Sequence, residues 1–133
     1  LVQRELFGPP VFEQIAEFEC SFSAPRSATP ERLKSDAALS QVAFRSIDRK
    51  RRVARMFVGT EPRDVDLSWS SVAISFMKPD PNDLITVTVF RAGQEPASPM
   101  GWKYAAVLSR HVASSVSGAA VQAEGTCRAP VSF

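Results

Sequence analysis

The 133-residue chain has few of the residues on which most enzyme and metal sites depend. It has one histidine, two cysteines and six glycines, and no apolar run approaches the roughly 20 residues that cross a bilayer. Cys20 and Cys127 lie near opposite ends, which excludes a CxxC redox motif and a cysteine-based zinc site. The glycines are too widely spaced for a phosphate-binding loop. The sequence therefore predicts no membrane span, no metal site and no cofactor.

A charge excess of one sign is also lacking. The 16 Lys and Arg residues face 14 Asp and Glu residues, so the net charge is only +2 and any anion binding must be local. The composition, with 44% hydrophobic residues and nine phenylalanines, is typical of an ordered globular protein. We expect a single globular domain over residues 1–133, with residues 1–10 as an extended arm because Pro9 and Pro10 interrupt regular hydrogen bonding.

The two cysteines leave two alternatives open. A disulfide between Cys20 and Cys127 would close almost the whole chain and stabilise the fold by about 4 to 5 kcal/mol in the chain-entropy description. Two buried thiols that serve as small apolar side chains fit the sequence equally well.

Hydrophobic periodicity predicts strands in the first half of the chain. A helical turn near residues 11–18 leads into a strand, in which Phe18, Cys20 and Phe22 alternate with polar residues. Thr29 and Pro30 carry the signal of a helix start, so a helix is expected from Pro30 to about Leu39.

Two interpretations compete between residues 41 and 59. Apolar residues could extend the helix, or residues 42–58 could form two strands around a polar turn at Asp48–Arg51. The β-branched and aromatic content of this segment favours the hairpin.

The strand pattern of residues 64–77 shifts its parity at residues 70–71, which predicts a β-bulge or a sharp bend there. This segment is expected to form a hairpin with residues 84–90, and Trp69 and Phe76 should both be substantially buried despite their opposite parity.

Residues 98–118 have the clearest helical pattern. At 100° per residue, one stripe collects small and apolar side chains, namely Trp102, Ala105, Ala106, Ser109, Val112, Ala113 and Val116. Short strands are expected at residues 119–123 and 127–133. The sequence thus predicts an α+β fold, in which an antiparallel sheet of about five to seven strands packs against an amphipathic helix in the C-terminal half of the chain.

No group of residues has the spacing of a catalytic site. His111, expected on the polar side of the helix, would need an orienting partner and a nucleophile to act as a general base, and the sequence shows neither. We therefore predict no catalytic residue, and an unassigned small enzyme is the second alternative.

The densest charge feature is a basic cluster in the predicted hairpin. It consists of Arg45, Arg49, Lys50, Arg51, Arg52 and Arg55. Several cations on one hairpin can bind anionic oxygens and displace counterions, although positive charge on a hairpin can also serve only to prevent edge-to-edge pairing of strands. We expect a non-catalytic assembly or partner-binding module, such as the structural subunit of a particle or a multiprotein machine. It would form a homo-oligomer or larger protein assembly, and its basic hairpin would contact an anionic partner such as RNA or DNA.

A different hypothesis comes from two short segments, Arg51–Arg55 and Asp66–Ser71. They resemble the RxxxR and DxSxxG pair by which PilZ domains hold cyclic di-GMP, with Arg51, Arg55, Asp66 and Ser68 in the matching places. The resemblance covers about twenty residues. Ser71 stands where the motif has glycine, and only ten residues separate the two halves. The resemblance implies, as the alternative function, a small-ligand sensor for a cyclic dinucleotide.

Overall fold

Strands make up almost all of the described chain. The computed structural model describes residues 10–23, 40–80, 83–97, 101–112 and 120–130. In chain order the elements are the 3-10 helix η1 (Phe12–Gln14) and the strands β1 (Phe18–Phe22), β2 (Gln41–Asp48), β3 (Val53–Val58), β4 (Glu61–Trp69), β5 (Ala73–Asp80), β6 (Asp83–Phe90), β7 (Glu95–Pro96), β8 (Trp102–Val112) and β9 (Ala120–Ala129).

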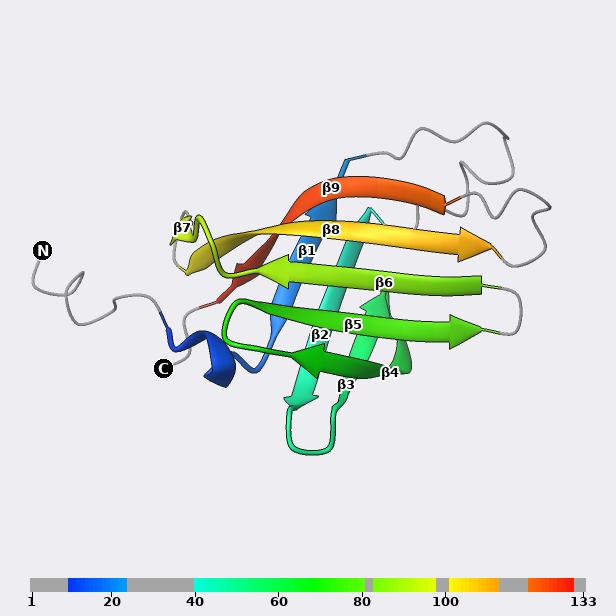
Figure 1. The fold of residues 1–133 in the computed structure, drawn as a ribbon, viewed down its shortest axis with the longest axis horizontal. Helices are drawn as coiled ribbons and strands as arrows, with labels where there is room; N and C mark the ends of the chain where they lie inside the picture. The colour runs from blue at the N-terminus through cyan, green and yellow to red at the C-terminus, as the bar shows by residue number, and fades with distance from the viewer. Residues whose placement is uncertain (1–9, 24–39, 81–82, 98–100, 113–119, 131–133) are drawn as a thin grey trace, which may run out of the picture.

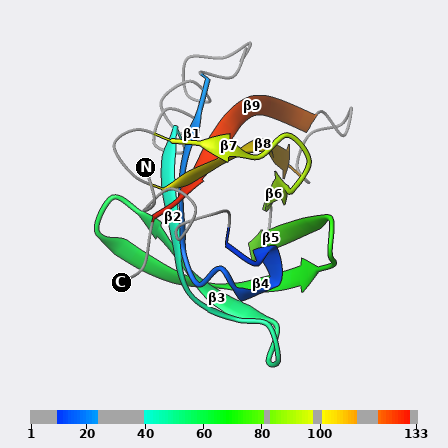
Figure 2. The same cartoon turned by 90° about the vertical axis from the view of Figure 1, so that its left-hand side faces the viewer.

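Eight of these strands form a closed antiparallel barrel (Figures 1 and 2). From β1 to β6, each strand pairs with the next strand along the chain. Strand β6 then pairs with β8, β8 pairs with β9, and β9 pairs with β1, which closes the ring. The two-residue strand β7 lies outside this ring and pairs with the start of β8. An eight-stranded barrel has an interior just wide enough for side chains to fill.

Alternating residues of each strand fill the interior. In β1, for example, Phe18, Cys20 and Phe22 point inward and the residues between them are exposed. At the centre, the rings of Phe44 and Phe76 stack with centroids 3.9 Å apart. The 3-10 helix η1 closes one end of the barrel (Figure 2), where Phe12 packs on the rings of Phe18 and Tyr104.

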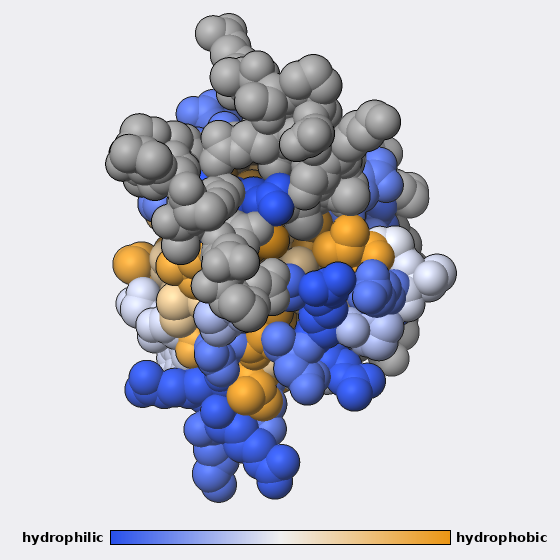
Figure 3. Space-filling view, turned by 90° about the vertical axis from the view of Figure 1, so that its right-hand side faces the viewer, coloured by the Kyte–Doolittle hydropathy of each residue, from blue (hydrophilic) through white to orange (hydrophobic). Residues whose placement is uncertain are grey.

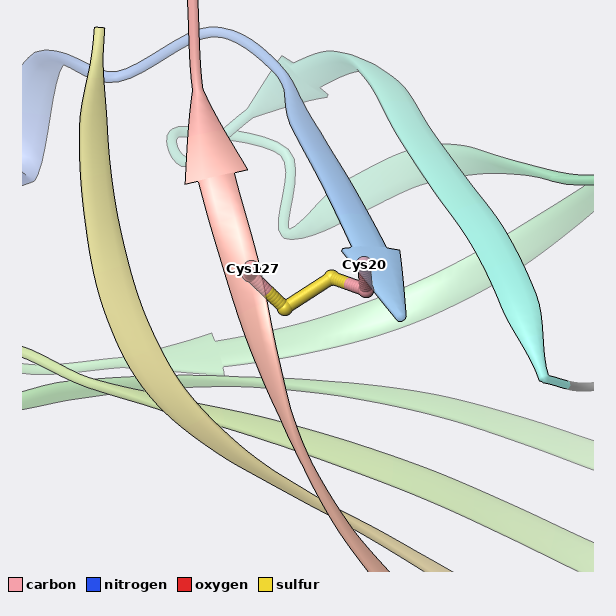
Figure 4. The surroundings of a disulfide bond; sticks show 2 residues. All are labelled: Cys20 and Cys127. Carbon is pink, nitrogen blue, oxygen red and sulfur yellow. A yellow bond between two sulfur atoms is a disulfide. The ribbon is translucent and has the colours of Figure 1, made fainter. Parts of the chain in front are cut away.

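A disulfide joins Cys20 to Cys127 (Figure 4). The two residues lie directly opposite each other in β1 and β9, where the first and last strands of the chain meet and close the ring. Of the two alternatives that the sequence left open, the structure therefore has the bonded pair. At the same seam, Gly125 has no room for a side chain, because an added Cβ atom would collide with the carbonyl oxygen of Ser21.

The α+β prediction is wrong, because the described residues form an all-β barrel of eight strands. The expected helix at residues 98–118 is instead strand β8 over Trp102–Val112, and residues 98–100 and 113–118 lie outside the described part. A helix would have placed Tyr104 and Leu108 on its polar side, whereas the strand sends both into the core. In addition, β8 gains backbone hydrogen bonds from β6 on one side and β9 on the other. Alanine and serine, which dominated the expected stripe, fit either structure.

Other expectations have mixed outcomes. The segment 42–58 is a hairpin of β2 and β3, so the helical extension is wrong. One strand, β9, replaces the two short strands expected near the C-terminus. The helix expected at residues 30–39 and the arm at residues 1–9 lie outside the described residues. Within the described part, no helix is long and apolar enough to cross a membrane.

The parity shift at residues 70–71 marks a reversal of the chain rather than a bulge within one strand. The expected single strand is two, β4 and β5, which pair with each other. The Ser70 hydroxyl accepts hydrogen bonds from the backbone N–H groups of Val72 and Ala73, at 3.2 and 3.3 Å, and these bonds hold the turn. Strand β5 then pairs with β6, which is the second strand of the expected hairpin.

Candidate functional site

The hairpin of β2 and β3 extends beyond the wall of the barrel (Figures 1 and 2). Its register shifts between Arg45 and Asp48, where β2 has one residue more than β3, and Ser46 adopts a left-handed conformation with a φ of 53°. Such a bulge bends a strand and increases its twist. The turn and its basic residues are thereby directed away from the barrel.

The turn between the two strands is fixed by hydrogen bonds on two sides. The backbone N–H of Arg51 donates to Asp48 Oδ1 at 3.0 Å. On the other side, the N–H of Leu67 in β4 donates to the carbonyl of Arg52 at 3.0 Å. Arg52 has a φ of 59°, the left-handed conformation that a tight turn requires. The turn therefore presents its side chains from a defined backbone.

Arg49 points back toward the barrel and not into solvent. Its Nη1 donates to the carbonyl of Ile15 at 2.7 Å, and its Nη2 donates to the carbonyl of Phe12 at 3.0 Å. Both carbonyls belong to the η1 segment that closes the barrel end. Burial lowers the pKa of the Arg49 guanidinium, and the charge of Glu13 acts in the opposite direction. Arg49 is thus a structural clamp, although the sequence placed it among the anion-binding residues.

The two strand arginines have acidic neighbours that the sequence did not reveal. Arg45 and Arg55 lie directly opposite each other, an unfavourable arrangement for like charges. Arg45 Nε is 3.9 Å from Glu17 Oε2, and Arg55 Nε is 3.6 Å from Asp64 Oδ1. The Arg45 guanidinium also lies 5.4 Å from the ring centroid of Phe57. These four residues, two cations of β2 and β3 with Glu17 just before β1 and Asp64 in β4, have no net charge.

The remaining cations, Lys50, Arg51 and Arg52, form the hairpin tip. The Arg51 side chain is 82% exposed, and its Nε is 3.9 Å from Asp48 Oδ2, a pair of little strength at that exposure. Lys50 and Arg52 are exposed and form no ion pair with any other described residue. Figure 3 shows hydrophilic side chains gathered on the projecting end where Figure 1 draws this hairpin. The tip is the part of the basic cluster that is free to meet an anion.

An exposed tryptophan lies against the same turn. Trp69 is the last residue of β4 and is 42% exposed. Its Nε1–H donates to the carbonyl of Arg49 at 3.3 Å. The prediction that Trp69 is buried is wrong, because it lies beyond the last buried residue of its strand, Leu67. The prediction for Phe76 is correct, since that side chain is 1% exposed.

The four residues of the PilZ resemblance lie on the outer surface near this hairpin. Asp66 is paired in register with Val53, while Arg55 forms its ion pair with Asp64. Arg51 is in the turn, and Ser68 is exposed on β4. None of the four lines either of the two surface grooves that flank β1, and the ligand-sensor alternative stays a prediction.

Two shallow grooves flank β1 on the outer wall. One, of about 400 Å³, is lined by residues that include Glu19, Lys103 and Arg128. The other, of about 390 Å³, lies over β2 and β3 and includes Phe57. The first groove mixes opposite charges, and Lys103 Nζ is 2.9 Å from Glu95 Oε1. Neither groove concentrates positive charge as the hairpin tip does.

The sequence also raised the questions of a metal site and of the role of His111. Within the described residues, no three His, Cys, Asp or Glu side chains are grouped to hold a metal ion. His111 is exposed on β8, paired in register with Leu84 of β6 and Ala120 of β9. Comparison of the chain with protein-family models, with curated proteins and with solved structures finds no match.

Proposed function

We propose that this protein is a non-catalytic binding module whose hairpin tip contacts a nucleic acid. The observation that carries the proposal is the division of the basic cluster. Arg49 is bound to the barrel, and Arg45 and Arg55 lie along the strands beside Glu17 and Asp64. Lys50, Arg51 and Arg52 project from a fixed turn, where Arg51 is 82% exposed despite its contact with Asp48 and the other two form no ion pair among the described residues.

Cations that project from a fixed backbone suit binding to phosphate groups. The counterions released from nucleic acid favour such contacts, and binding weakens as salt concentration rises. A net charge of +2 supplies no general attraction, so affinity should depend on the tip. We expect non-specific binding with a Kd between about 1 and 100 µM at physiological salt.

The test is a salt titration of binding to a fluorescently labelled dT oligonucleotide and to its duplex with dA. The variant combines Lys50→Gln with Arg52→Asn, because asparagine tolerates the left-handed backbone at this position. Loss of two phosphate contacts should reduce the slope of log affinity against log salt by about 1.4 on the single strand and about 1.8 on the duplex.

A charge-matched control combines Arg63→Gln with Lys103→Gln. Both side chains are partly exposed and are paired, with Glu61 and Glu95, away from the tip. The control should keep a slope within about 0.5 of the wild type. Equal losses in the two variants, or binding of poly-glutamate in place of nucleic acid, would contradict the proposal.

The expected assembly into a homo-oligomer or a larger particle is part of the same proposal. Light scattering coupled to size-exclusion chromatography would measure the mass with and without the oligonucleotide. A monomer under both conditions would remove the assembly part and leave the binding part intact.

A further inference from the structure

Trp69 is an exposed aromatic ring fixed beside the hairpin tip. The bond from its Nε1–H to the Arg49 carbonyl ties the edge of the indole to the turn that carries Lys50, Arg51 and Arg52. The neighbouring bond from the Leu67 N–H to the Arg52 carbonyl holds the same two segments together. Ring and cations are therefore parts of one surface.

Other aromatic rings near the cluster are not available to a ligand in this way. Phe44 is fully buried in the core, and Phe12 is buried beneath the clamp formed by Arg49. Phe57 is covered on one side by the guanidinium of Arg45. Among the described aromatic residues close to the tip, Trp69 combines high exposure with a fixed position.

We propose that Trp69 is a stacking platform for an unpaired base, so that the hairpin binds single-stranded nucleic acid in preference to duplex. The inference rests on the proposed function and specifies its ligand. An exposed ring beside cations lets a base stack while the adjacent phosphates meet Lys50 and Arg52. In a duplex the bases are stacked on each other, so no free base face is available to stack on the Trp69 ring.

The same surface fits an anionic membrane less well. A segment that inserts into a membrane surface buries an apolar face among the lipids, whereas the turn here carries the exposed cations Lys50, Arg51 and Arg52. Interfacial tryptophans also use the indole N–H at the headgroup level, and in Trp69 that group already donates to a backbone carbonyl.

The experiment uses the intrinsic fluorescence of Trp69. The chain has two tryptophans, and Trp102→Phe leaves Trp69 as the single reporter. We expect the dT oligonucleotide to quench this fluorescence, and the dT–dA duplex and vesicles with anionic headgroups to leave it nearly unchanged. A blue shift on vesicles without quenching by dT would overturn the inference in favour of a membrane surface.

Affinity measurements on single variants that keep Trp102 complete the test. Trp69→Ala should weaken binding to the dT oligonucleotide by roughly 5- to 150-fold, the range of one lost base–aromatic contact, and should leave duplex binding within about twofold. Trp69→Phe, which keeps a ring but loses the bond to Arg49, should retain most of the affinity. Val72→Ala, at a side chain that is 65% exposed, is the matched apolar control and should have no effect.

The measurements distinguish a failure of the stacking role from a failure of the proposed nucleic-acid binding. If the tip variant loses affinity but Trp69→Ala affects single strand and duplex equally, or affects neither, the stacking role is wrong and the polyanion-binding function stands. If the wild-type protein binds neither nucleic acid, both proposals are wrong.

Discussion

Replacing Arg49 should damage stability and not nucleic-acid binding. The substitution Arg49→Met keeps the aliphatic stem and removes the donors to the carbonyls of Ile15 and Phe12. Hydrogen bonds from a charged group contribute about 1.5 to 3 kcal/mol each. The clamp is only half-buried, and its Nε–H is buried without a partner among the described residues, so we take about 1 to 2 kcal/mol for each of the two bonds. We expect a loss of about 2 to 4 kcal/mol.

The loss should be visible in both thermal and chemical unfolding. An unfolding entropy of about 0.28 kcal/mol/K is typical for a domain of this length, so the melting temperature should fall by about 7 to 14 °C. In urea the midpoint should fall with an unchanged m value. Arg49→Lys, which keeps the charge but cannot bridge two carbonyls as a planar fork does, should lose an intermediate amount.

Lys50→Met is the matched control for this prediction, since it removes the same charge one residue away at an exposed site. It should change stability by no more than about 0.5 kcal/mol, and it should reduce the salt slope of binding by roughly 0.7 to 0.9. Arg49→Met should instead lower the stability and leave the salt slope of binding unchanged. If Arg49→Met were as stable as Lys50→Met, or if it lowered the salt slope as much, the division of the basic cluster would be wrong.

Two further predictions concern the core. Replacing Cys20 and Cys127 together by alanine opens a loop of 107 residues. The unfolding free energy should fall by about 4.8 kcal/mol and the melting temperature by roughly 17 °C. A loss below about 1 kcal/mol would show that the pairing of β1 with β9 is stable without the disulfide. Burial raises the pKa of Tyr104, with a smaller opposing effect from the charge of Arg91. Because the folded state prefers the neutral phenol, this contribution to stability is complete below pH of about 10 and is lost as pH rises through the folded pKa. Absorbance of the phenolate at alkaline pH reports this single tyrosine, and ionisation at the ordinary pKa of a free tyrosine would contradict its burial.

Most strands of the fold were predictable from alternation, and the barrel was not. In β1 the period of two is clear, and in β2 and β3 the β-branched and aromatic content around a polar turn correctly favoured the hairpin over the helical alternative. In β8 the same criterion failed, since small residues such as Ala105 and Ala106 satisfy both periods. The decision between helix and strand came from β6 and β9, which supply hydrogen-bonding partners on both sides of β8.

The basic cluster was predictable as a cluster, but the roles of its members were not. Six cations within eleven positions are visible in the sequence. The partner of Arg45 is Glu17, and Arg49 donates to carbonyls 34 and 37 residues away. Trp69 was misjudged for a related reason, because parity predicts the direction of a side chain but not where the barrel ends.

By itself the sequence determined the alternation that separates inward from outward residues, the positions of most turns and the local concentration of positive charge. These properties depend on neighbours within a few residues, and the chemistry of the chain specifies them directly. Only the tertiary structure decided that the sheet closes on itself, that Cys20 lies opposite Cys127, and that within the basic cluster Arg49 is bound to the barrel while Lys50, Arg51 and Arg52 project from the turn. Each of these depends on pairing between segments far apart in sequence, and such pairing follows from which arrangement buries the most apolar surface while satisfying the backbone hydrogen bonds.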